Sequence, residues 1–290
     1  MAYFEYKPTT PLFYYTGIDA FENIVRSKKL WLTDVTASND PREVNLGREM
    51  FSAAINALTE DDIPLLNRRD LAAFLADVLR FSRTSTCYTV CFALAGDELP
   101  MWREYATGGS GVSIAFRPTA MNAMPGRMQL VRYADETTPA VFRDAAIRAA
   151  LTMGKPRSVS AILAASEAFA TFTSLKHRTW AYEREVRMIF NQRDEKPDPN
   201  EILTQMVSAH PDGSIIEWAP PLTRESRGRT VKYFEFPFGR HTKNGPDPRR
   251  AIEHILLGPK CAMSAAEVTA ILEAEGYEGF TIKASDCQIQ

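Results

Sequence analysis

Charged residues alternate along the segment 180-WAYEREVRMIF-190, where Glu183, Glu185 and Arg187 occupy every second position. Successive side chains of a β-strand point to opposite faces, so an extended segment would place these three together and an apolar row opposite them. Neighbouring carboxylates can transfer protons or stabilise a developing positive charge, and a guanidinium can keep a carboxylate ionised or bind phosphate. The segment predicts a strand whose polar face is either solvent-exposed or the wall of an active site.

Further candidates for ligand binding occur in three other segments. They are Tyr14, Tyr15 and Thr16 in 11-PLFYYT-16, Asn39 and Asp40 in 37-ASNDPRE-43, and Trp102 and Tyr105 in 101-MWREYA-106. Aromatic rings can stack on a planar ring of a ligand, and the polar groups can contact ribose. Each segment also has a structural interpretation, because tyrosines fit half-buried strands and an Asx–Pro segment forms a turn. For Trp102, a core anchor is the favoured interpretation.

Two other polar clusters are interpreted structurally. The segment 107-TGGSG-111 precedes a predicted strand and not a helix, so a plain turn is favoured over a phosphate-binding loop. Lys176, His177 and Arg178 follow a predicted helix, where positive charge favours the helix dipole. Phosphate binding is the alternative for this basic cluster.

Hydrophobic periodicity indicates which elements must position these residues. It predicts helices near 19–30, 44–58, 69–81, 101–106, 139–153, 158–176 and 262–276. Strands are predicted near 11–16, 30–35, 85–94, 112–116, 127–133, 180–190, 214–219, 230–236, 252–260 and 279–285. Because these elements do not alternate as βαβα, they favour a single α+β domain over 1–290. We expect 44–82 to be a helical insertion or lid, and 194–213 to be an irregular excursion.

Composition excludes several classes of protein. The chain has 290 residues, of which 45% are hydrophobic and 24% charged, and a net charge of −2, so no basic field indicates nucleic acid. No apolar run is long enough for a membrane helix, and the N-terminus lacks the features of a signal peptide, so we expect a cytoplasmic protein. Four cysteines without a CxxC pair, and only four histidines, predict neither a disulfide framework nor a metal site.

Five segments together resemble a bacterial family described as domain of unknown function 2971. They are 12-LFYYTG-17 with the following helix and KLWLT, 38-SNDPRE-43, 100-PMWREYATGGSGVSIAF-116, 176-KHRTWAYEREVRMIF-190 and 255-ILLGPK-260. They occur in the order of that family and extend over nearly the whole chain. The resemblance by itself implies no activity.

A second resemblance, to ADP-ribosyltransferases, rests on the opening strand with its following helix and on the late strand that begins with glutamate. The DNA-targeting toxins and the RNA 2′-phosphotransferases are the most similar branches. The resemblance implies a split antiparallel or mixed β-sheet with flanking helices and a helical insertion. It implies catalytic roles for Glu185, or Glu183, and for Tyr14, which stands where those enzymes have histidine. It also implies that NAD is bound by Tyr15, Thr16, Asn39, Asp40, Trp102, Tyr105 and Arg187.

The function implied by this resemblance is transfer of ADP-ribose from NAD to a macromolecule. The acceptor would be DNA, RNA or protein, and the protein would be a bacterial toxin or antiphage defence effector, with an antitoxin as a possible partner. A catalytically inactive nucleotide- or nucleic-acid-binding module is the alternative, favoured by the phenol of Tyr14 in place of an imidazole. A glycohydrolase acting on NAD or another nucleotide is a third interpretation.

Overall fold

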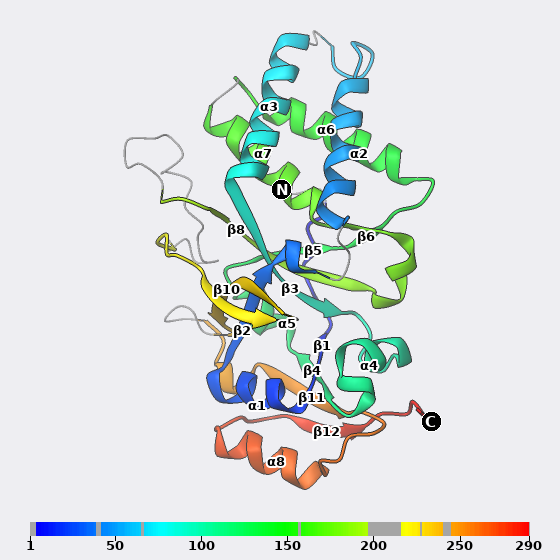
Figure 1. Cartoon of the computed structure of the whole chain (residues 1–290), viewed down its shortest axis with the longest axis vertical. Coiled ribbons are helices and arrows are strands. Elements are labelled where there is room, and N and C mark those ends of the chain that lie inside the picture. Colours follow the sequence, from blue (N-terminus) through cyan, green and yellow to red (C-terminus); the bar gives the residue numbers. More distant parts are fainter. Residues whose placement is uncertain are drawn as a thin grey trace.

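The computed structural model describes residues 4–38, 42–64, 67–155, 158–196, 216–226, 228–239 and 245–289 (Figure 1). Its strands are β1 (Leu12–Thr16), β2 (Lys29–Asp34), β3 (Ser85–Ala93), β4 (Val112–Phe116), β5 (Arg127–Leu130), β6 (Arg132–Tyr133), β7 (Leu175–Lys176), β8 (Glu185–Arg193), β9 (Leu222–Ser226), β10 (Arg229–Pro237), β11 (Ile252–Leu257) and β12 (Thr281–Ala284). Its α-helices are α1 (Ile18–Ser27), α2 (Glu43–Ala57), α3 (Arg68–Thr84), α4 (Leu99–Tyr105), α5 (Pro118–Asn122), α6 (Thr138–Thr152), α7 (Val159–Phe172) and α8 (Ala265–Ala274). Short 3-10 helices are η1 (Val35–Ala37), η2 (Thr107–Gly109), η3 (Arg178–Glu183) and η5 (Pro248–Arg250). The predicted α+β class is confirmed.

Most of the strands form one mixed sheet in the order β12-β11-β4-β1-β3-β2-β10-β9, and β8 pairs with both β3 and β5. Strands β11 and β12 are parallel, whereas the other pairs of this sheet are antiparallel. Strands β6 and β7 form a separate parallel pair.

The sheet opens along one edge of β3. The other edge of this strand pairs with β8 over its whole length, from Ser85 to Ala93. On the open edge, β2 pairs only with Tyr88 and Thr89, and β1 pairs only with Ala93. Because β1 and β2 therefore diverge, none of the described strands lies beside the backbone of β3 between Thr89 and Ala93 on this edge. This divergence leaves room for a cavity in the middle of the sheet.

Apolar residues cover both faces of the sheet, but with different helices. The alternate residues Val90 and Phe92 of β3 and Val186 and Met188 of β8 belong to a large core cluster that also includes residues of α1, α5 and α8. The opposite face is covered at one end by α2, α3, α6 and α7, which lie together in Figure 1. At the other end, α4 covers it through a smaller cluster around Trp102. The cavity described below is lined mainly from this second face, and Tyr14, Val90 and Phe92 of the first cluster also reach it.

The predicted block 44–82 corresponds to α2 and α3, which pack against α6 and α7 from later in the chain. Gly47 of α2 lies directly against the backbone of Phe172 at the end of α7, where a Cβ atom would come within 2.3 Å of the carbonyl oxygen. The two helices therefore belong to a four-helix cluster. Its role as an insertion or lid stays a prediction.

Several predicted boundaries are wrong. The strand expected over 180–190 begins only at Glu185, because η3 and the left-handed residue Arg184 (φ 45°) precede it. The helix expected to reach 176 ends at Phe172, where the Thr173 and Ser174 hydroxyls donate to carbonyls of the last turn. No strand forms over 216–219, and residues 214 and 215 lie outside the described residues. Most of the excursion predicted over 194–213, from 197 onward, also lies outside them.

Within the described part of the chain, none of the helices has the length and apolar character that crossing a membrane requires.

Candidate functional site

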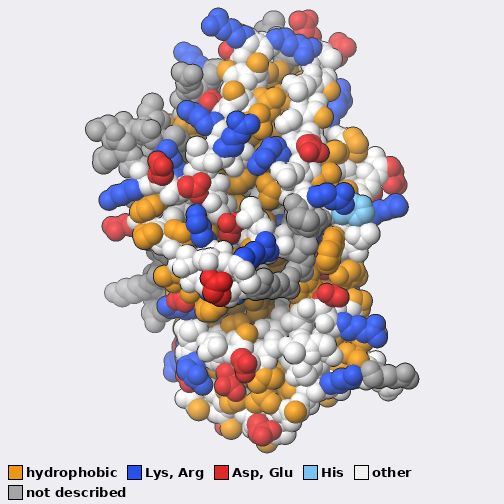
Figure 2. Space-filling view, in the orientation of Figure 1, with side chains coloured by type: hydrophobic (Ala, Val, Ile, Leu, Met, Phe, Trp, Pro, Cys, Tyr) orange, Lys and Arg blue, Asp and Glu red, His pale blue; other side chains and the backbone are white. Residues whose placement is uncertain are grey.

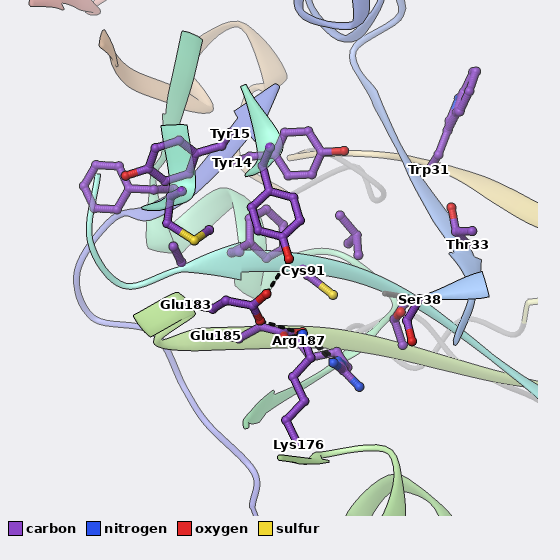
Figure 3. A pocket seen from close by; sticks show the side chains of 17 residues that line it. Tyr14, Tyr15, Trp31, Thr33, Ser38, Cys91, Lys176, Glu183, Glu185 and Arg187 are labelled. Carbon is purple, nitrogen blue, oxygen red and sulfur yellow. Dashed lines mark hydrogen bonds and ion pairs between the residues drawn. The ribbon is translucent and has the colours of Figure 1, made fainter. Parts of the chain in front are cut away.

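A cavity of about 220 Å³ lies where β1 and β2 diverge from β3 (Figure 3). Its walls come from segments that are distant in the sequence: β1, β2, β3, α4, β7, η3 and β8. The lining residues are Phe13, Tyr14, Tyr15, Trp31, Thr33, Ser38, Thr89, Val90, Cys91, Phe92, Ala93, Met101, Tyr105, Lys176, Glu183, Glu185 and Arg187. The early tyrosines and the acidic segment therefore line the same cavity.

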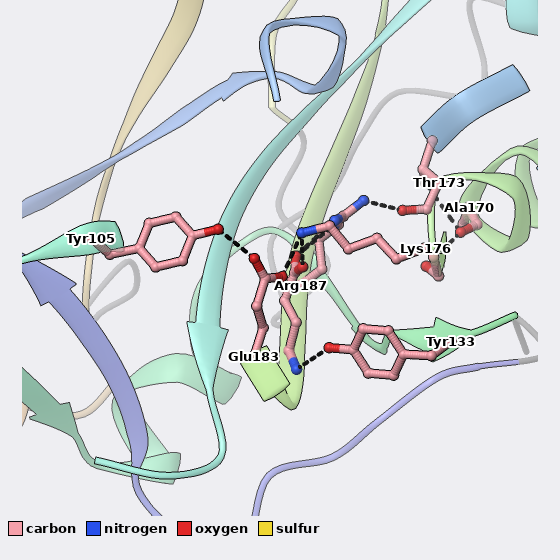
Figure 4. Close-up of polar contacts among 9 residues, drawn as sticks. Tyr105, Tyr133, Ala170, Thr173, Lys176, Glu183 and Arg187 are labelled. Carbon is pink, nitrogen blue, oxygen red and sulfur yellow. Dashed lines mark hydrogen bonds and ion pairs between the residues drawn. The ribbon is translucent and has the colours of Figure 1, made fainter. Parts of the chain in front are cut away.

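The first residues of strand β8 supply a buried ion pair. The Arg187 side chain is 1% exposed and Glu185 is 2% exposed, so the polar face of this strand is not solvated. Arg187 Nε and Nη2 lie 2.8 Å and 2.7 Å from Glu185 Oε1, and Arg187 Nη1 donates to the Thr173 carbonyl oxygen (Figure 4). The alternation of side chains along β8 explains why both residues reach the same cavity.

Glu183 reaches the cluster from η3, and Lys176 reaches it from β7. The Lys176 ammonium group lies 2.5 Å from Glu183 Oε2 and 2.8 Å from Glu185 Oε2, so it bridges the two carboxylates. The Tyr105 hydroxyl donates to the other oxygen of Glu183 (Figure 4). Two carboxylates and two cations thus form one network, in which each charge has a partner.

The two carboxyl groups of this network differ in proton affinity. Burial opposes ionisation of Glu185, but the positive charges of Arg187 and Lys176 outweigh it and hold the pKa of this carboxyl well below its usual range. At Glu183, burial dominates over the attraction of Lys176, and the negative charge of Glu185 adds to it, so the pKa is raised. One carboxylate is therefore suited to remain charged, and its neighbour is suited to exchange a proton.

Strand β3 forms the back wall of the cavity. Its pairing with β8 places Cys91 beside Arg187 and Ala93 beside Glu185. The Cys91 side chain is exposed in the cavity. Surrounding protein raises the pKa of its thiol by desolvation, and the charge of Glu185 adds to this effect. The thiol is therefore protonated near neutral pH, and no nucleophilic role is indicated.

The three predicted residues of β1 differ in their surroundings. The Tyr14 ring packs edge-to-face on Phe92, and among the described residues its hydroxyl has no hydrogen-bond partner. Burial raises the pKa of this phenol. The Tyr15 hydroxyl donates a hydrogen bond to the Ala95 carbonyl and accepts one from the Glu98 amide. Both hydrogen bonds connect this tyrosine to the loop after β3, so its hydroxyl has a structural role. Thr16 is buried and does not line the cavity.

Trp102 is the core anchor that its sequence context favoured, and not a ligand platform. The side chain is fully buried, its indole nitrogen donates to Asp97 Oδ1 at 2.6 Å, and its ring packs on Tyr15. The glycine-rich segment that follows is a packed turn, since Gly111 lies against the backbone of Thr16. Asn39 and Asp40 lie outside the described residues.

Two features of the cavity were missed from the sequence. Lys176, assigned above to a helix end, is instead a residue of β7 that is buried between a carboxylate of η3 and a carboxylate of β8. Trp31 lines the cavity with 41% of its surface exposed. The alternation in 30-LWLTD-34 could have indicated Trp31, because a tryptophan there shares the polar face with Thr33 while Leu30 and Leu32 are buried.

Among the described residues, no group of three or more histidine, cysteine, aspartate and glutamate side chains could hold a metal ion.

Comparison with known proteins finds a match for part of the chain. Residues 101–188 match the model of a family described as a protein of unknown function (DUF2971). The matched region begins in α4 and ends in β8, so it includes Tyr105, Lys176, Glu183, Glu185 and Arg187. No curated protein and no solved structure matches the chain.

Proposed function

We propose that the protein binds NAD in this cavity, breaks the bond between nicotinamide and ribose, and transfers ADP-ribose to a macromolecule. The observation that supports the proposal is that Tyr14, from the start of the chain, and Glu183 and Glu185, from a much later segment, line one cavity. The divergence of β1 and β2 from β3 also supports it, because the resemblance to ADP-ribosyltransferases implies a split sheet.

The cavity suits a reaction that builds positive charge on a sugar carbon. Nicotinamide would leave with the electron pair of the glycosidic bond, and the ribose carbon would become oxocarbenium-like. Glu185, whose pKa is lowered, would be the fixed negative charge that stabilises this state. Glu183, whose pKa is raised, would accept the proton that the nucleophile of the acceptor loses when it attacks the ribose carbon.

Release of nicotinamide from NAD, in the presence of DNA, RNA or protein acceptors, tests the proposal. Glu185→Gln keeps the shape of the side chain but removes its charge, and we expect it to lower turnover by a factor on the order of 10²–10³. Glu49→Gln, an exposed change on α2, is the matched control and should leave turnover unchanged. Absence of release with every acceptor, or full activity of Glu185→Gln, would contradict the proposal.

A catalytically inactive nucleotide-binding module is the second candidate. It is favoured by the pairing of Glu185, whose oxygens already accept from Arg187 and Lys176. Tyr14 also offers one hydroxyl where the similar enzymes have an imidazole. Calorimetric binding of NAD without release of nicotinamide would support this candidate, and release of nicotinamide with no acceptor present would instead indicate a glycohydrolase. A role as a toxin or defence effector, with an antitoxin partner, rests on the resemblance alone.

A further inference from the structure

A second cavity adjoins the first on the side of the β9–β10 hairpin. It has a volume of about 240 Å³ and shares Thr33, Ser38, Thr89 and Cys91 with the cavity described above. Its outer wall consists of Arg224 and Ser226 of β9 and Arg229 and Val231 of β10. The two cavities therefore form one continuous groove that crosses β2 and β3.

The register of β2, β10 and β9 places a line of aromatic and basic groups along this groove. Tyr233 is opposite Thr33, and Val231 is opposite Arg224, so these side chains share one face with Trp31. The Tyr233 ring lies 4.7 Å from the Trp31 ring, centroid to centroid, and the Arg224 guanidinium lies 5.2 Å from the Trp31 ring. Trp31 is thus supported by two neighbours, and it still has 41% of its surface open. A rigid, exposed indole in a cavity is suited to stack on a planar ring.

Within the part of the chain that the structure describes, the two arginines of the groove use only some of their hydrogen-bond donors. Arg224 Nη2 reaches Thr33 Oγ1 at 3.4 Å, and Arg229 Nη2 donates to the Ala37 carbonyl at 3.0 Å. Arg224 Nε is buried without a hydrogen-bond partner, and among the described residues neither guanidinium forms an ion pair with a carboxylate. Asp34 also lines the groove, but its carboxylate accepts from the amide and hydroxyl of Thr36. A guanidinium with free donors is a group that binds phosphate oxygens.

The face of the molecule drawn in Figure 2 does not carry a broad positive field. Figure 2 shows Lys and Arg side chains interspersed with Asp and Glu over this face of the molecule, consistent with the net charge of −2. Attraction of a phosphate must therefore come from individual side chains at the groove and not from long-range steering.

We infer that the groove is a nucleotide subsite, in which a base stacks on Trp31 and the attached phosphate is bound by Arg224 and Arg229. The nucleotide unit can belong to a dinucleotide or to a single-stranded nucleic acid, since both contain the same base and phosphate. The inference rests on the proposed function only in that both place a nucleotide in this cavity, and it requires no transfer chemistry.

Calorimetric titrations with AMP and with adenosine test the phosphate contact. We expect AMP to bind at least tenfold more tightly than adenosine, and Arg224→Gln, which leaves only Arg229 to bind the phosphate, to reduce this difference. Arg224→Lys keeps the positive charge but lacks the planar guanidinium group, so we expect it to restore only part of the difference in affinity that Arg224→Gln removes. Arg83→Gln, which removes an exposed arginine at the end of α3, is the matched control and should leave the difference intact. Equal binding of AMP and adenosine by the unaltered protein would overturn the inference.

Trp31→Leu tests the stacking contact, and we expect it to weaken AMP and adenosine alike by about tenfold. Arg229→Gln, at an exposed position, provides a second charge variant if Arg224→Gln does not fold, as thermal unfolding would reveal. Unchanged binding by both Trp31→Leu and Arg229→Gln would also overturn the inference.

Titrations with NAD and with hexathymidylate distinguish the two sources of the nucleotide. A loss of NAD affinity in Arg224→Gln assigns the subsite to the dinucleotide, whereas a loss of hexathymidylate affinity assigns it to a nucleic-acid strand. Failure of both to bind would contradict the subsite. Nicotinamide release is measured in parallel, so tight AMP binding without release would contradict the proposed function and leave the subsite supported.

Discussion

At the scale of single residues, the two carboxylates of the cavity depend on one shared cation. Lys176 Nζ lies within 3 Å of both Glu183 and Glu185, and it also lies 5.4 Å from the centroid of the Trp180 ring. All three charged side chains are almost completely buried. Removing one partner of a buried ion pair is costly, because the remaining charge has lost its attraction but keeps its desolvation penalty.

We therefore expect Lys176→Met to lower the free energy of unfolding by about 3–5 kcal/mol. Urea denaturation followed by circular dichroism measures the change. Lys29→Met is the matched control, because Lys29 also pairs with a glutamate, Glu235, at 2.9 Å, but at the surface. Loss of an exposed pair should cost less than about 1 kcal/mol. Similar losses in the two variants would show that the buried network does not stabilise the fold.

At the scale of elements, the position of α2 is set by a close contact with α7. A Cβ atom on Gly47 would lie 2.3 Å from the Phe172 carbonyl oxygen and 2.7 Å from its Cα atom. Both of these atoms belong to backbone, which cannot move aside as a side chain can. The contact also lies only a few residues before Lys176, so the packing of the helices and the position of the buried lysine are connected.

Gly47→Ala should destabilise the protein by about 1–3 kcal/mol, as overpacking of a well-packed contact does. The sign of this effect is informative, because alanine in place of glycine at an unconstrained helical position stabilises by roughly 0.5–1 kcal/mol. Thermal and urea unfolding measure it. Glu49→Ala, an exposed change on the same helix, should stay within about 0.5 kcal/mol of the unaltered protein. Stabilisation by Gly47→Ala would mean that α2 and α7 are not in this contact.

At the scale of the whole molecule, stability should depend on pH through the buried carboxyl groups. The pKa of Glu185 is lower in the folded protein than in the unfolded chain, where it is about 4.3. Its contribution to stability is therefore present above about pH 4.3 and is lost as the pH falls. Glu183 has a raised pKa, so its contribution is present below about pH 4.3 and declines as the pH rises through the folded pKa.

We expect the free energy of unfolding of Glu185→Gln to decrease less at acidic pH than that of the unaltered protein. For Glu183→Gln we expect it to decrease less as the pH rises. Free energies of unfolding in urea, measured from about pH 3 to about pH 7, show both slopes. Glu49→Gln should keep the slopes of the unaltered protein. If the free energy of unfolding of Glu185→Gln fell more steeply at acidic pH than that of the unaltered protein, folding would not lower the pKa of Glu185.

The sequence by itself determined the α+β class, most of the helices and strands, and the common face of Glu185 and Arg187. These features follow from local periodicities, since the alternation along a strand is a property of the strand alone. The paired early tyrosines and late glutamates were also visible as candidates in the sequence.

Only the tertiary structure decided how these candidates are used. Glu183 joins Glu185 although it lies on a 3-10 helix, because Lys176 from another strand holds both. Trp102 of α4 is buried in the cluster at one end of the sheet, whereas Trp31 of β2 is exposed in the cavity. The cavity itself exists because β1 and β2 each pair with only part of β3. Such pairings join segments distant in sequence, so no local pattern contains them.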